Sequence, residues 1–175
     1  MLNRIARLIR HRWMDEAHRV VTPDMLERLK QRVAASENQH TGEICICIEG
    51  GLPNSYLLQP DALDALSRKR ALTQFGKLGI WDTEHNNGVL IYLLLAERHI
   101  ELVPYLRADT ATEAAVCHQF DMAMVQRLAL ALRDGKFEDG LSLAVADVSA
   151  VLAAHFPPTA GHVKRNELPD QPVLA

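Results

Sequence analysis

The chain has 175 residues, a hydrophobic fraction of 48%, a charged fraction of 23% and a formal net charge of −3. These values predict one soluble globular domain with a substantial core, and they provide no positive field that would favour nucleic acid as a partner. No hydrophobic run approaches the roughly 18 residues of a membrane-spanning helix, and arginines interrupt the first residues too often for a secretory signal, so we expect a cytoplasmic protein.

The first segment, residues 1–21, is predicted to hold a basic amphipathic helix and a linker. Within residues 2–13, four apolar side chains recur at spacings of three and four, and arginines fill many of the positions between them. Such a helix can lie on an anionic membrane surface, pack on the domain, or bind an unidentified protein partner. The sequence leaves these alternatives open, and peripheral attachment to the inner membrane is one of them.

The main domain is predicted over residues 22–156, and it begins with a helix. The Thr-Pro-Asp motif at residues 22–24 is a typical helix start, and the apolar periodicity that follows it fades near residue 38. The next element, EICICI at residues 43–48, is a strand that is apolar on both faces. Its cysteines, Cys45 and Cys47, are predicted to be buried hydrophobic residues, because the C-x-x-C spacing of a zinc ribbon is absent.

A helix and a hairpin come next. Residues 61–77 are predicted to be helical, residues 89–95 form a second strand that is apolar on both faces, and residues 99–103 alternate like a strand with one wetter face. The short connection between the last two elements predicts a tight antiparallel hairpin, and Pro104 is expected to end its pairing.

Two amphipathic helices, with apolar stripes over residues 117–131 and 137–152, close the domain. The tail, residues 157–175, is rich in proline, has no periodicity, and is predicted to be disordered. The overall pattern predicts an α/β fold: a three-layer α/β/α sandwich, Rossmann-like, around a small mixed β-sheet. A helix connects the first two strands, so we expect them to be parallel.

Several motifs resemble the TPM-domain family, and in particular its short bacterial branch. They are T-G-E-I at residues 41–44, F-G-K-L-G-I-W at 75–81, N-N-G-V-L-I-Y-L at 86–93, A-E-R-x-I-E-L-V at 96–103 and G-K-F-E-D-G-L at 135–141. The resemblance implies a Rossmann-like sandwich with an acidic cleft near the end of the sheet, which in some members holds calcium. The family also carries an acid-phosphatase label. One departure is the turn after the hairpin, where an Asp-Arg-Gly pattern is replaced by Pro-Tyr-Leu-Arg at residues 104–107.

Six polar residues at positions 82–87 stand directly before the second strand. One interpretation is a turn, in which Asn87-Gly88 supplies positive φ angles. A second is a site for calcium or another divalent cation, whose oxygen ligands would come from Asp82, Glu84, Asn86 and Asn87. A third is catalysis. The cluster enters its strand from the amino end, whereas ligands of α/β sheets gather at the carboxyl ends of parallel strands.

The predicted function is a TPM-like accessory or interaction module that can bind a divalent cation without robust catalysis. One alternative is a weak, metal-assisted acid phosphatase, in which Arg98 or Arg107 neutralises charge and Asp82 or Asp109 acts as base or nucleophile. Another is a peripheral adaptor at a membrane complex through residues 2–13. Cys117 lacks a positioned base, the sequence assigns no catalytic residue, and an enzymatic role rests on the family resemblance alone.

Overall fold

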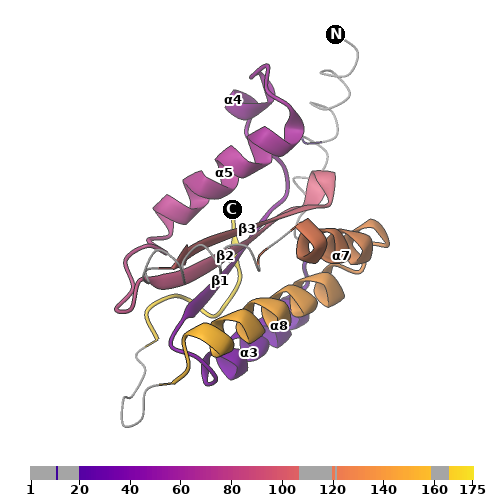
Figure 1. Cartoon of the computed structure of the whole chain (residues 1–175). Helices are drawn as coiled ribbons and strands as arrows, with labels where there is room; N and C mark the ends of the chain where they lie inside the picture. The colour runs from indigo at the N-terminus through magenta and orange to yellow at the C-terminus, as the bar shows by residue number, and fades with distance from the viewer. Residues whose placement is uncertain (1–10, 12–19, 107–119, 121, 159–165) are drawn as a thin grey trace.

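The computed structural model describes residues 11, 20–106, 120, 122–158 and 166–175. Apart from His11, the predicted helix at residues 2–13 lies outside the described residues, and so do Arg107, Asp109 and Cys117. In the described part, one small sheet lies between helices that cover both of its faces (Figure 1). The predicted α/β/α arrangement is therefore confirmed.

The sheet has four strands: β1 (Glu43–Glu49), β2 (Asn87–Leu94), β3 (His99–Leu106) and β4 (Val173–Leu174). Their order is β3-β2-β1-β4, with β1 parallel to both β2 and β4, and β2 antiparallel to β3. The mixed sheet and the parallel pairing of the first two strands are as predicted. Because β1 and β2 are adjacent and parallel, their carboxyl ends lie side by side at one end of the sheet.

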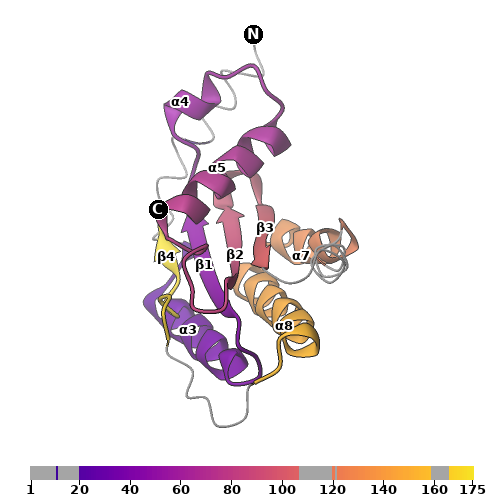
Figure 2. The same ribbon diagram turned by 60° about the vertical axis from the view of Figure 1, so that its left-hand side comes forward.

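Helices α3 (Pro23–Glu37), α7 (Met122–Arg133) and α8 (Phe137–His155) lie on one side of the sheet. The short α4 (Asn54–Leu57) and the longer α5 (Leu63–Lys77) lie on the other (Figure 2). The predicted start of α3 is confirmed, because the Thr22 side chain accepts a hydrogen bond from the Met25 backbone N–H at 3.2 Å.

Two hydrophobic clusters pack against the two faces of the sheet. Alternate strand residues such as Ile46 and Ile91 join a cluster with α3, α7 and α8, whereas Cys47 and Leu90 join a cluster with α5. Every residue of β1 and β2 is buried, as expected for strands covered on both faces. Cys45 and Cys47 are free and buried, which confirms their interpretation as core residues.

The hairpin between β2 and β3 has the predicted antiparallel pairing, with a 3-10 turn at Leu95–Glu97 and a left-handed residue at Arg98. The expectation that Pro104 ends the pairing is wrong. Pro104 is paired with Val89, and the ladder continues to Leu106. Among the described strands, β3 is at the edge and has no neighbour on its outer side, and a proline without an N–H is tolerated in such a position.

The prediction of disorder for residues 157–175 is wrong where the structure describes the end of this tail. Asn166 and Asp170 lie beside the end of α3, and β4 pairs with β1. Leu168 is buried in the cluster on the α5 side. The described end of the tail is held by a few aliphatic contacts and a strand of two residues. Such contacts produce no periodic pattern in the sequence, so the sequence did not predict them.

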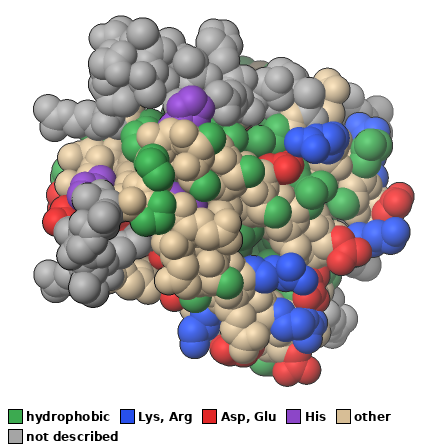
Figure 3. Space-filling model, turned by 60° about the horizontal axis from the view of Figure 1, so that its bottom comes forward, with side chains coloured by type: hydrophobic (Ala, Val, Ile, Leu, Met, Phe, Trp, Pro, Cys, Tyr) green, Lys and Arg blue, Asp and Glu red, His purple; other side chains and the backbone are tan. Residues whose placement is uncertain are grey.

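The lower face of the molecule carries Lys and Arg side chains next to Asp and Glu side chains along one side (Figure 3). Its described side chains therefore form no patch of a single charge sign. Among the helices that the structure describes, none is long and apolar enough to cross a membrane.

Gly88 is required by the close approach of the segment before β2. A Cβ at this position would lie 2.3 Å from the Ile80 carbonyl oxygen. We expect Gly88→Ala to lower the free energy of unfolding by about 1–3 kcal/mol, the usual result of overpacking. Gly76→Ala is the matched control, since its Cβ would meet nothing within 4 Å and alanine favours a helix by about 0.5–1 kcal/mol. Urea denaturation measures both, and equal stability of the two variants would contradict the steric account.

Candidate functional site: a cleft at the carboxyl end of the parallel strands

A cleft of about 550 Å³ lies where β1 ends. Its lining comes from the end of β1, the loop into α4, helix α5, His11 and the tail: His11, Glu49, Gly51, Leu52, Pro53, Asn54, Leu57, Arg70 and Ala175. In α/β sheets, ligands bind outside the carboxyl ends of parallel strands. This cleft has the expected position for a ligand site.

Glu49, the last residue of β1, is the buried acid of this cleft, with 3% of its surface exposed. Arg70 of α5 binds its carboxylate through two nitrogens: Nε lies 3.0 and 2.9 Å from the two carboxylate oxygens, and Nη2 lies 2.6 Å from Oε1. The Tyr92 hydroxyl of β2 donates to Oε2 at 2.7 Å. These charge-assisted contacts compensate for the loss of water around the carboxylate.

The same contacts determine the protonation of the neighbouring groups. Hydrogen bonding to Glu49 raises the pKa of Arg70, so its guanidinium remains charged. Burial, together with the charge of Glu49, raises the pKa of Tyr92, so the phenol keeps the proton that it donates. Burial also raises the pKa of Cys47 to about 12, which makes its thiolate inaccessible at neutral pH.

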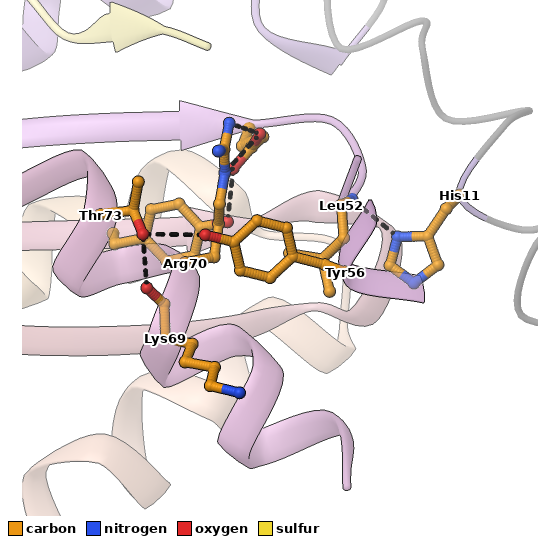
Figure 4. A network of polar contacts seen from close by, with 8 residues as sticks. His11, Leu52, Tyr56, Lys69, Arg70 and Thr73 are labelled. Carbon is orange, nitrogen blue, oxygen red and sulfur yellow. Dashed lines mark hydrogen bonds and ion pairs between the residues drawn. The ribbon is translucent and has the colours of Figure 1, made fainter. Parts of the chain in front are cut away.

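Tyr56 supports the arginine from α4. Its ring centroid lies 5.5 Å from the Arg70 guanidinium carbon, within cation–π range. The hydroxyls of Tyr56 and Thr73 are hydrogen bonded at 2.8 Å, and Thr73 donates to the Lys69 carbonyl oxygen (Figure 4). The arginine is therefore positioned between a carboxylate and an aromatic ring, both of which are themselves anchored.

His11 forms another part of the wall and is 5% exposed. The Leu52 backbone N–H donates to Nδ1 at 2.9 Å, so Nδ1 is an acceptor and carries no proton. Nε2 then carries the proton and lies 2.9 Å from a carboxylate oxygen of Glu97. Gly51 makes this contact possible, because a Cβ there would lie 2.6 Å from the His11 carbonyl oxygen.

Nη1 of Arg70 is the guanidinium nitrogen that takes no part in the bonds to Glu49. The bonds to Glu49 use Nε and Nη2, and Tyr56 is the other side chain whose hydrogen bonding raises the pKa of Arg70. Arg70 lines the cleft, and a guanidinium has five N–H donors, so it has donor capacity beyond its bonds to Glu49.

The polar loop at residues 82–87 lies at the other end of the strands, where β2 begins. Asp82, Glu84 and His85 are exposed, and the Glu84 backbone N–H donates to Glu167 of the tail. Asn86 has a φ of 50°, whereas Asn87 and Gly88 begin β2, so the positive φ falls one residue earlier than expected.

Asn87 is the buried member of the predicted metal set, with 1% of its surface exposed. Its amide nitrogen donates to Thr41 at 3.0 Å, and its Oδ1 has no hydrogen-bond partner among the described residues. The predicted ligands thus divide into exposed Asp82 and Glu84 and a buried amide. No group of three His, Cys, Asp or Glu residues suited to a metal occurs within the described ranges. Calcium binding by this loop stays a prediction.

The other side chains considered from the sequence have structural partners. Arg98 donates to the Arg133 carbonyl oxygen at the start of the α7–α8 connection. His99 lies 2.7 Å from Glu101, and the hydrogen bond to Glu101 raises the pKa of His99. Neither residue lines the cleft at the carboxyl end of β1, which is called the carboxyl-edge cleft below.

The sequence reasoning missed Glu49, Arg70, Tyr92 and His11. For Glu49 a signal was present, because an acid at the end of a doubly apolar strand lies at the edge where ligands bind. For Arg70 no comparable signal exists, since it is one of several basic residues in a row on α5. Arg68 bonds to the Leu102 carbonyl oxygen and Lys69 to Asp61, so only the fold distinguishes Arg70 from them.

Comparisons with known proteins agree with this architecture. The NMR structure of the BA42 protein from the psychrophilic bacterium Bizionia argentinensis matches with a TM-score of 0.62 and 19% identity over 89% of this chain and 95% of that chain. The solution NMR structure of the N-terminal domain of a P. gingivalis protein matches with a TM-score of 0.53 and 19% identity, over 82% and 83% of the two chains. At these identities the likeness concerns the fold. No curated protein sequence gives a significant match.

The fold is thus a mixed α/β sandwich with a polar cleft at the carboxyl edge of its parallel strands. A model of the TPM domain matches residues 14–151, which is most of the chain. The chain belongs to the TPM domain family, as its motifs indicated.

The buried hydroxyl of Tyr92 can be tested against that of Tyr56. We expect Tyr92→Phe to lower the free energy of unfolding by about 1.5–3 kcal/mol, because a hydrogen bond to a buried carboxylate is lost. Tyr56→Phe removes a bond between two neutral hydroxyls, and its effect should be about 0.5–1.5 kcal/mol. Chemical denaturation of both variants measures the difference. A larger loss for Tyr56→Phe would contradict the central role given to Glu49.

The raised pKa of His99 predicts a pH dependence of stability. The protonated form is favoured in the folded state, so its stabilising contribution is complete below the ordinary histidine pKa and disappears as the pH rises through the raised folded value. We expect the stability difference between wild type and His99→Gln to be largest below the ordinary histidine pKa of about 6.5 and to shrink as the pH rises above it. A pH-independent difference would exclude this linkage. His85→Gln, at an exposed histidine, is the control.

Proposed function

We propose that this TPM-domain protein is a binding module that holds an anionic group of its ligand, a carboxylate or a phosphate, on Nη1 of Arg70 in the carboxyl-edge cleft. It carries out no robust catalysis there. The observation that carries the proposal is the arrangement of Arg70: Glu49 binds two of its nitrogens, Tyr56 supports its guanidinium, and the residue lines the cleft, which leaves donor capacity for a ligand. A planar guanidinium held in this way is suited to carboxylate and phosphate oxygens.

The titratable groups of the cleft already make hydrogen bonds within the protein, which favours ligand binding over catalytic turnover. Glu49 accepts from Arg70 and Tyr92, so it is a poor candidate for a general base. Both nitrogens of His11 are engaged, one by the Leu52 N–H and one by Glu97. Among the described lining residues, no other histidine, acid or cysteine side chain is present to act as base or nucleophile.

The net charge of the cluster limits the expected affinity. The charge of Arg70 is largely balanced by Glu49, so an isolated anion should bind with a dissociation constant on the order of millimolar. A natural ligand or partner would then need further contacts. The leucines that line the cleft, Leu52 and Leu57, are apolar surfaces suited to that purpose.

Two other functions remain as alternatives, and neither has a specific observation in its favour. A metal-assisted acid phosphatase follows from the family label, and an aryl phosphate assayed with and without divalent cations tests it. Asp82→Ala should abolish genuine turnover at the amino-edge loop. A membrane adaptor through residues 2–13 is tested by co-sedimentation with anionic liposomes, before and after deletion of residues 1–13.

An anion titration tests the proposed site. With inorganic phosphate or acetate as the probe, backbone amide shifts in NMR spectra should concentrate at Gly51, Leu52 and Asn54, with saturation on the order of millimolar. Arg70→Lys should weaken this binding several-fold, because lysine keeps the charge and loses the planar fork.

Arg68→Lys is the matched control, since Arg68 is on the same helix and bonds to β3 outside the cleft. Equal weakening in both variants, or shifts spread over the whole surface, would show that the anion binds by general charge attraction. Amide shifts of each free variant that stay confined to the surroundings of the substitution establish that its fold is intact.

A further inference from the structure

The outer edge of β1 is covered by the chain's own tail. Parallel pairing joins Cys47 to Val173 and Ile48 to Leu174. The Ala175 backbone N–H continues the ladder by donating to the Ile48 carbonyl oxygen at 3.0 Å. The tail is thus a strand added to the edge of a sheet that would otherwise present unpaired backbone groups.

The side chains of this added strand alternate between the two faces of the sheet. Val173 packs against the cluster that contains Cys47, on the α5 side. Leu174 packs against the opposite cluster, which contains Ile48. Leu168 and Pro172 are also buried. The edge of β1 therefore accepts an extended segment whose alternate aliphatic side chains fit two separate hydrophobic surfaces.

The attachment of the tail is short. Strand β4 has two residues, and both are only partly buried. The earlier part of the tail is joined to the domain by Glu167, which accepts from the Glu84 backbone N–H at 2.6 Å, whereas the bond from Asn166 to Asp170 at 2.9 Å lies within the tail. Such a short parallel ladder has few hydrogen bonds to break when the strand leaves the sheet.

We propose that the tail, residues 166–175, is an exchangeable strand and that the edge of β1 binds the same segment of a second copy of this chain. The occupant is identified by fit, because the tail is the sequence whose side chains match both surfaces of this edge. Reciprocal exchange keeps every contact of the tail and converts two chains into a two-fold dimer. The effective concentration of the attached tail, on the order of millimolar, opposes exchange and makes the dimer concentration-dependent.

This inference goes beyond the proposed function and does not rest on it. Ala175 lines the carboxyl-edge cleft, so in an exchanged dimer each chain would contribute its Ala175 to the cleft of the other chain. Anion binding can still fail while exchange occurs, and exchange can fail while the anion binds. The two experiments read different signals and distinguish these cases.

A disulfide formed between two different chains tests the exchange. One chain carries Val173→Cys together with Cys47→Ser, and the second chain keeps Cys47. In the first chain the introduced thiol has no partner in its own β1, so a bond to Cys47 requires its tail to lie on the second chain. Cys45→Ala and Cys117→Ser in both chains remove the other thiols. The mixture is equilibrated in a glutathione redox buffer at alkaline pH, because burial raises the pKa of Cys47, and it is then separated by non-reducing electrophoresis.

The expected result is a covalent heterodimer whose ratio to monomer rises about tenfold for each tenfold increase in concentration, while dimer is the minor species. The matched control replaces Val173→Cys by Leu174→Cys, which packs on the other face beside Ile48. It should give at least several-fold less heterodimer.

A single chain with Val173→Cys and native Cys47 provides the second control, since it should form the bond within one chain. If that internal bond forms and the heterodimer is absent at every concentration, the exchange is excluded. If the internal bond also fails to form, the pairing of β4 with β1 is not maintained in solution, and the proposal fails with it. Equal heterodimer from both thiol positions would show unspecific oxidation and would also overturn it.

Discussion

The burial of β1 and β2 on both faces is the constraint on which the rest of this structure depends. Every residue of both strands is buried, so each strand needs helices above and below it. Helices α3, α7 and α8 meet this need on one side, and α5 meets it on the other. In such a sheet, polar side chains fit at the ends of the strands. The polar groups that can bind or react are therefore concentrated at the amino and carboxyl ends of β1 and β2.

The buried polar groups at the two ends of the strands are satisfied by different kinds of contact. At the amino edge, Glu37 accepts a hydrogen bond from the Ile44 backbone N–H at 2.8 Å, and Asn87 donates to Thr41. These contacts join α3 and the loops to the beginnings of the strands. Where β1 ends, the charge of Glu49 is balanced by Arg70, and Tyr92 donates a hydrogen bond to it. Removing one partner of a buried ion pair leaves an uncompensated charge, so this cluster acts as a unit.

The fold was largely predictable because its strongest signals are local. Thr22 begins α3, and the apolar runs at β1 and β2 indicate doubly buried strands. Pro104 and the tail were predicted wrongly for a common reason. Whether a proline can stay in a ladder depends on the strand being at the edge, and whether two residues such as Val173 and Leu174 form a strand depends on a free edge of β1. Neither condition can be read from neighbouring residues.

The amino-acid sequence by itself determined the family, the order of the elements, the parallel pairing of β1 with β2 and the burial of Cys45 and Cys47. Periodicity and turn chemistry act over a few residues, which is why they are readable without a structure. Only the tertiary structure decided which polar residues meet. Residues 11, 49, 70, 92 and 175 are far apart in the chain, and their convergence at one cleft results from the packing of α5 and the tail against β1. Side chains of one type, such as Arg68 and Arg70, differ only in the partners that this packing provides.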